Sequence, residues 1–102
     1  MDKSQVLEKV MQYTALVNEK MKPQKIILYG SYAKGNSKED SDIDIAIVVD
    51  KIDENFLDTE VMLYKLRRHV DDRIEPILID SNEDKSGFLD EILKNGQIIY
   101  SA

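Results

Sequence analysis

The sequence predicts an α+β fold in two layers, in which helices cover one face of a mixed central β-sheet. Segments with helical spacing of apolar residues alternate with short apolar strands in the order α-β-loop-β-α-β-α-β. The chain has 102 residues, of which 42% are hydrophobic and 33% are charged. This length and composition are typical of one globular domain, so we expect residues 1–102 to form a single domain.

A long amphipathic helix is expected at the start of the chain, over about residues 4–21. Asp2 and Gln5 are suited to form a capping pair at its beginning, and Pro23 follows its end. The apolar residues at helical spacing are Val6, Leu7, Val10, Met11, Leu16 and Val17.

Two strands should follow this helix. Residues 25–29 form a short apolar run that predicts a buried strand leading into Gly30. Residues 43–49 are mostly β-branched and predict the strongest strand of the sheet. The polar residues between the two strands carry turn signals, so we expect a loop there.

The second half of the chain predicts two more helices and two more strands. Residues 73–79 predict a strand in which Pro76 indicates a bend or a sheet edge. Residues 88–93 predict a short helix that ends at an Asn-Gly turn signal, and residues 97–100 predict a last strand. Residues 54–70 predict a helix, whose expected inward side chains are Leu57, Val61, Tyr64, Leu66 and Val70.

Charge and composition exclude several classes of protein. Twenty acidic residues against 14 basic ones give a net charge of −6, which argues against binding to a nucleic acid backbone. No apolar run approaches the roughly 20 residues that span a bilayer, so no membrane association is expected. The polar start of the chain does not resemble a signal peptide, and the sequence has no cysteine. We therefore expect a cytoplasmic protein without disulfides or thiolate metal sites.

Two aspartates, Asp42 and Asp44, carry the strongest chemical signal. The period of a strand places both side chains on one face, where no basic residue accompanies them. Two adjacent carboxylates repel each other, and a divalent cation between them would remove this repulsion. Because Mg²⁺ prefers hard oxygen ligands, the pair predicts a magnesium site.

A phosphate-binding turn is predicted just before this pair. Gly30 allows backbone N–H groups to approach a phosphate closely, and the Ser31 hydroxyl can donate to a phosphate oxygen. Together with Asp42 and Asp44, this turn predicts a site for a nucleoside triphosphate with Mg²⁺. Glu75 lies in the middle of an apolar strand; if that strand neighbours the aspartates, the three carboxylates could hold two metal ions.

Other interpretations of these motifs are weaker. The spacing of glycines in residues 30–35 resembles a P-loop, but Asn36 stands where that motif has lysine. The alternating aspartates of residues 40–44 resemble a calcium loop, but Ile45 replaces its required glycine. The two aspartates could also decorate a solvent-facing strand, although the adjacent Gly-Ser turn argues against this.

The remaining polar and aromatic candidates have simple structural explanations. His69 and the Arg67–Arg68 pair are expected at a helix end, where cations interact favourably with the helix dipole and solvent. Tyr29 and Tyr32 flank the glycine turn, and ordinary packing is favoured over stacking on a base.

Taken together, the motifs resemble the signature of the DNA polymerase β-like nucleotidyltransferases. The resemblance lies in Gly30–Ser31, residues 33–35 and residues 41–44. The short length and residues 88–100 look like the minimal nucleotidyltransferases of bacteria and archaea. The resemblance extends over about residues 25–100 and implies the polymerase β-like fold.

The resemblance also implies a role for each matching residue. It implies that Asp42 and Asp44 hold two Mg²⁺ ions and that Glu75 completes the metal site and helps to deprotonate a hydroxyl. The residues that it assigns to nucleotide binding, with ATP as substrate, are Gly30, Ser31 and Lys34. Lys34 stands where the family commonly has arginine, and Glu75 where it often has aspartate. Lysine keeps the charge but lacks the planar fork, and glutamate keeps the ligand atoms.

The acceptor is expected on another macromolecule, because a chain of this length has no room for a second substrate-binding domain. The minimal members are similar to the antitoxin of a two-gene module whose partner is a helical HEPN-type ribonuclease toxin. That resemblance implies transfer of AMP from ATP to a toxin tyrosine, and it would allow a hetero-oligomer. The alternative is a non-catalytic nucleotide-binding module that only masks a helical partner.

Overall fold

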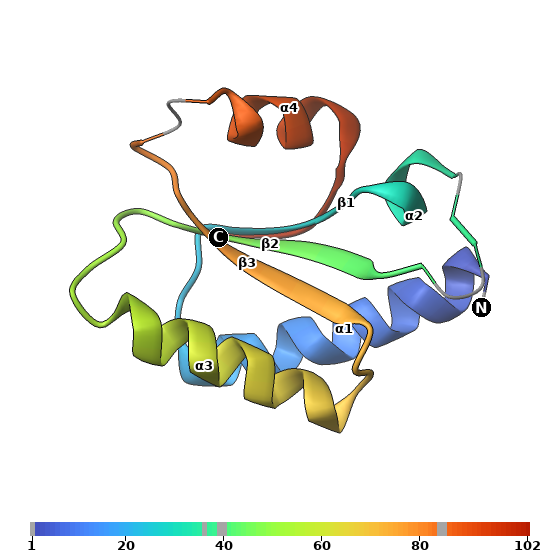
Figure 1. Cartoon of the computed structure of the whole chain (residues 1–102), viewed down its shortest axis with the longest axis horizontal. Helices are drawn as coiled ribbons and strands as arrows, with labels where there is room; N and C mark the ends of the chain where they lie inside the picture. The colour runs from blue at the N-terminus through green and yellow to red at the C-terminus, as the bar shows by residue number, and fades with distance from the viewer. Residues whose placement is uncertain (1, 36, 39–40, 84–85) are drawn as a thin grey trace.

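A computed structural model describes residues 2–35, 37–38, 41–83 and 86–102 (Figure 1). Within these residues, the helices and strands alternate much as the sequence predicts. The elements in chain order are α1 (Lys3–Lys20), β1 (Lys25–Tyr29), α2 (Ser31–Lys34), β2 (Ile43–Val49), α3 (Phe56–Leu66), the 3₁₀ helix η1 (Arg67–His69), β3 (Ile74–Asp80), α4 (Phe88–Asn95) and β4 (Gln97–Ser101).

The strands form one mixed sheet in the order β3-β2-β1-β4. β1 is antiparallel to both β2 and β4, whereas β2 and β3 are parallel and are connected through α3. The α+β class and the mixed sheet are therefore confirmed. Pro76 lies on β3, at the edge of the sheet, where its missing N–H breaks no ladder between two strands.

Helices lie on both faces of this sheet, which differs from the expected arrangement (Figure 1). α1 and α3 cover one face, as predicted, but α4 packs on the other. The first layer buries Val6, Val10, Tyr13, Val17, Ile26, Leu28, Tyr32, Ile43, Ile45, Ile47, Leu63, Leu66 and Ile74. The second buries Ile27, Ala46, Val48, Leu89 and Ile92. The central strands are apolar on both faces, so a helix is needed on each side.

The start of α1 has the predicted capping box. The Asp2 carboxylate accepts a hydrogen bond from the Gln5 backbone N–H at 2.9 Å, and the Gln5 side-chain oxygen accepts from the Asp2 N–H at 3.0 Å. Further along the helix, the buried Tyr13 hydroxyl donates to the Leu63 carbonyl at 2.7 Å. This bond attaches α1 to α3 beneath the sheet.

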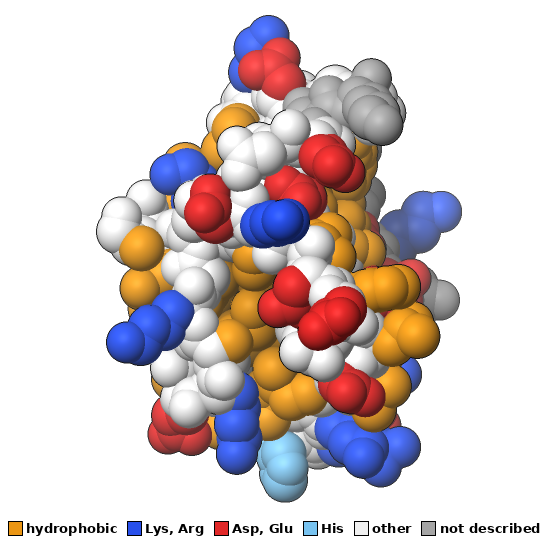
Figure 2. All heavy atoms as spheres, turned by 90° about the vertical axis from the view of Figure 1, so that its left-hand side faces the viewer, with side chains coloured by type: hydrophobic (Ala, Val, Ile, Leu, Met, Phe, Trp, Pro, Cys, Tyr) orange, Lys and Arg blue, Asp and Glu red, His pale blue; other side chains and the backbone are white. Residues whose placement is uncertain are grey.

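α3 presents only part of the predicted stripe to the core. Leu66 is buried as predicted, together with Leu63, but Leu57, Val61 and Tyr64 are 63%, 53% and 40% exposed. The helix packs against β3 and α1 and needs only a narrow apolar stripe for these contacts. Figure 2 shows hydrophobic side chains reaching the surface among acidic and basic ones, on the side where α3 begins. Within the described residues, no helix is both long and apolar enough to cross a membrane.

Candidate active site

Three neighbouring strands bring Tyr29, Asp44 and Glu75 into one row across the sheet. Tyr29 on β1 is paired with Asp44 on β2, and Asp44 is paired in turn with Glu75 on β3. Asp44 alternates with Ile43 and Ile45, which face α1 and α3, so it belongs to the face that α4 partly covers. Asp44 and Glu75, two of the three predicted carboxylates, are thus direct neighbours on parallel strands.

Gly30 is packed directly against the Asp44 carboxylate. It follows β1, has a φ of 76°, and precedes the first residue of α2. A Cβ atom at this position would overlap the Asp44 Oδ2 atom and would lie only 3.2 Å from its Cγ. Glycine is therefore required here for two reasons, its backbone conformation and the space that Asp44 occupies.

The pKa of Asp44 depends on the charges of the other two predicted carboxylates, Asp42 and Glu75. Partial burial raises the pKa of Asp44, and the negative charges of Asp42 and Glu75 raise it further. Asp42 itself is exposed and lies just before β2 begins. Ionisation of Asp44 is thus less favourable than that of a free aspartate, and a nearby cation would favour the ionised form.

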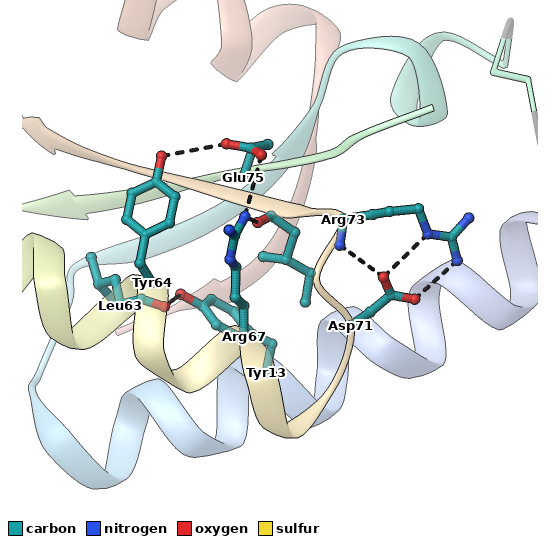
Figure 3. A network of polar contacts seen from close by, with 8 residues as sticks. Tyr13, Leu63, Tyr64, Arg67, Asp71, Arg73 and Glu75 are labelled. Carbon is teal, nitrogen blue, oxygen red and sulfur yellow. Dashed lines mark hydrogen bonds and ion pairs between the residues drawn. The ribbon is translucent and has the colours of Figure 1, made fainter. Parts of the chain in front are cut away.

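Glu75 has protein partners that the sequence analysis did not identify (Figure 3). The Tyr64 hydroxyl donates to one carboxylate oxygen at 3.4 Å, and the Arg67 guanidinium contacts the other at 3.3 Å. Arg67 also donates to the Ile74 carbonyl at 3.0 Å and lies 4.9 Å from the centre of the Tyr64 ring. The sequence analysis expected Arg67 at a solvated helix end. In the structure, its guanidinium is instead a partner of Glu75. The signal in the sequence is the spacing of three residues, which places Tyr64, near the end of α3, and Arg67, at the start of η1, on the same side.

The donor set fits a hard divalent cation at the aspartate pair. Asp42 and Asp44 offer carboxylate oxygens, and the pKa of Asp44 is raised by burial first and by the charges of Asp42 and Glu75 second. Glu75 lies in register with Asp44, but both of its oxygens accept from Tyr64 or Arg67. In the described ranges, no three acidic or histidine side chains are grouped as a metal site, so the two-metal arrangement stays a prediction.

The predicted loop after Gly30 begins with one helical turn, α2, which is too short to be recognised from periodicity. Ser31 begins it and Lys34 ends it, and Gly35 closes it in a left-handed conformation. Tyr32 is buried in the core, so packing is the right interpretation for this residue. Asn36 and Asp40, on which the P-loop and calcium-loop alternatives depend, lie outside the described residues.

Comparison with known proteins settles the family. The sequence model of the family described as "Polymerase beta, Nucleotidyltransferase" matches residues 11–102. The chain belongs to this family. One curated relative is a protein of Methanocaldococcus jannaschii described as a protein adenylyltransferase, which is 38% identical over 48 residues. This match covers 47% of the chain and about half (48%) of that relative.

Solved structures of similar fold include a nucleotidyltransferase and chains of toxin–antitoxin structures. A protein from Sulfolobus solfataricus, described as a nucleotidyltransferase, has a TM-score of 0.72 at 20% identity, over 97% of this chain and 83% of that one. A chain in a toxin–antitoxin structure with AMP-PNP has a TM-score of 0.65 at 26% identity, over 94% and 73%. A chain in the complex of an AMPylated HEPN toxin with its MNT antitoxin, from Shewanella oneidensis, has a TM-score of 0.60 at 22% identity, over 98% and 73%.

Proposed function

We propose that this protein is a Mg²⁺-dependent adenylyltransferase that transfers AMP from ATP to a tyrosine hydroxyl of a helical HEPN-type toxin, and thereby acts as its antitoxin. The observation that carries the proposal is the row of Asp44 and Glu75 beside Gly30, in a chain of the polymerase β nucleotidyltransferase family. The likeness to chains in toxin–antitoxin structures, one of them with an ATP analogue, supports the choice of partner and nucleotide.

In this proposal each residue has a separate task. Gly30, Ser31 and Lys34 bind the phosphates, and Asp42 and Asp44 hold the divalent cation. Bound Mg²⁺ would neutralise the triphosphate charge and polarise its phosphorus–oxygen bonds. Glu75, at the far end of the row, accepts the proton of the incoming hydroxyl. The hydroxyl oxygen forms a bond to the α-phosphorus, the bond from that phosphorus to the bridging oxygen breaks, and pyrophosphate leaves.

Radiolabelled ATP tests the proposal. The protein is incubated with Mg²⁺, its partner toxin and ATP labelled either at the α- or at the γ-phosphate. Transfer of the α-label alone to the toxin, with none from the Asp44→Asn variant, is the expected result. A toxin that is inhibited without being labelled would support the masking module instead. Label in RNA rather than in the toxin would contradict the assignment of the toxin as the acceptor.

A further inference from the structure

We infer that a small cavity between α4 and the turn after β1 binds the base of an adenine nucleotide. The cavity has a volume of about 110 Å³. Gly30 and Lys34, two of the residues assigned to the phosphates, line one end of it. Tyr29 and one side of α4 line the rest. The inference rests on the proposed function, because it requires the phosphates to lie at Gly30.

The position and the size of the cavity suit one end of a nucleotide. Three larger cavities lie elsewhere, two of about 380 and 520 Å³ beside α3 and one of about 430 Å³ beside α1, and none is lined by any of the six candidate site residues. Complete ligand pockets usually measure about 300–1,000 Å³, so a cavity of about 110 Å³ is suited to one end of a ligand. A nucleotide whose phosphates lie at Gly30 could place its base here and leave the α-phosphorus near Asp44.

The apolar part of the cavity suits a flat aromatic ring. The rings of Tyr29 and Phe88 meet edge to face, with centroids 5.5 Å apart and an angle of 86° between their planes. Ile92, one turn further along α4, is buried beside them. A planar base can stack on one of these rings while its edge contacts the other.

The polar part of the cavity can form hydrogen bonds with the edge of an adenine base. Glu91 and Asn95 are four residues apart on α4 and line the same cavity. An ionised carboxylate can only accept hydrogen bonds, whereas an amide both donates and accepts. The edge of adenine presents an amino donor beside a ring acceptor, which these two side chains complement.

Calorimetric titration with ATP and with inorganic triphosphate, both with Mg²⁺, separates the base from the phosphates. Phe88→Ala is expected to weaken ATP binding about tenfold, since stacking of a base on an aromatic ring is worth about 1–3 kcal/mol. Binding of inorganic triphosphate should change less than about twofold. Phe56→Ala is the matched control, because Phe56 lines a different cavity, at the start of α3, and should leave both affinities unchanged.

Two further variants make the test specific. Phe88→Leu keeps an apolar side chain on α4 but removes the flat ring, so it should weaken ATP binding while the melting temperature is retained. Glu91→Ala removes the acceptor for the adenine amino group, so it should weaken ATP binding without weakening triphosphate binding. Equal losses for ATP and triphosphate in the Phe88 variants, or no loss for either, would overturn the base site and leave the phosphate site intact. Failure of the unaltered protein to bind either compound would contradict the proposed function as well.

Discussion

Gly30 and Asp44 fit together because the glycine has no side chain: the Asp44 carboxylate occupies the space in which a Cβ atom would lie. Gly30→Ala should therefore displace Asp44 and also strain a backbone with a φ of 76°. The expected cost in unfolding free energy is about 1–2 kcal/mol for the backbone alone, with a further loss from the displaced carboxylate. Urea denaturation measures the stability, and the transfer assay measures the activity.

Gly35 provides the matched control for this change. Its φ of 77° is almost the same, but among the described residues beyond its chain neighbours no atom lies within 4 Å of its Cβ position. Gly35→Ala should thus lower the unfolding free energy through backbone strain and leave the transfer activity unchanged. Equal effects of the two substitutions on stability and activity would show that the contact between Gly30 and Asp44 is unimportant.

The Asp44→Asn variant should separate catalysis from stability. Removing one ligand charge should lower AMP transfer by at least about two orders of magnitude, since metal-dependent transfer depends on charge neutralisation. The melting temperature of the metal-free protein should stay unchanged or rise, because burial and the charges of Asp42 and Glu75 disfavour the ionised carboxylate. Full turnover by this variant would rule out a metal site at Asp44.

Glu75→Gln should affect turnover more than ATP binding. In the proposed reaction Glu75 accepts the proton of the hydroxyl, while the aspartates and Gly30 bind the nucleotide. We expect kcat to fall at least about tenfold and the KM for ATP to change less than about threefold. Steady-state kinetics with varied ATP gives both values. An equal fall in ATP affinity would place Glu75 in nucleotide binding instead.

Arg67→Gln tests the partner of Glu75. The ion pair is partly exposed, so its loss should lower the unfolding free energy by less than about 1 kcal/mol. The glutamate would then be free of its cation and less firmly held, so kcat should fall while the KM for ATP stays the same. Arg68→Gln, which changes a neighbouring exposed arginine, should have neither effect on kinetics.

Asp71 should make stability depend on pH in the acid range. Burial opposes its ionisation, but hydrogen bonds from Arg73 and Lys9 outweigh this and lower its pKa from 3.8 to about 2. The ionised form is therefore favoured by folding. Its stabilisation, about 2 kcal/mol, is complete above pH 4 and is lost as the pH falls toward 2. Urea denaturation at several pH values should show this loss, and Asp71→Asn should remove it.

Asp90→Asn is the control for the Asp71 measurement. Asp90 forms an ion pair with Lys94 one turn away on α4, but both side chains are more than 60% exposed. Its removal should change the unfolding free energy by less than about 0.5 kcal/mol at any pH. A pH dependence as large as that of Asp71 would show that the hydrogen bonds of Asp71 with Arg73 and Lys9 are not the cause.

The sequence allowed most of the fold to be predicted, because helix and strand periods in this chain are clear. Strands 25–29 and 43–49 were recognised from β-branched and apolar runs, and the start of α1 from its capping pair. The side of the sheet that α4 covers was not recognised. Its apolar residues show that it packs on the sheet, but periodicity within one helix does not tell which face receives it.

The site could be predicted only where its residues are close in sequence. Asp42, Asp44 and the Gly30 turn lie within a short segment, so their proximity follows from one pair of adjacent strands. The register of Asp44 with Glu75 depends on a parallel crossover, which the sequence does not specify residue by residue. The role of Arg67 does not follow from the sequence, because its hydrogen bonds to Glu75 and the Ile74 carbonyl arise only when α3 packs beside β3.

The row of residues across the sheet also determines from which direction each substrate can arrive. Neighbouring strands are about 4.8 Å apart, so Glu75 on β3 lies roughly 10 Å from the Tyr29 and Gly30 end of the row. In the proposed reaction, the nucleotide would enter beside β1 and the hydroxyl beside β3. Because β3 is the edge of the sheet, a folded protein can present a tyrosine there without displacing any strand of this chain.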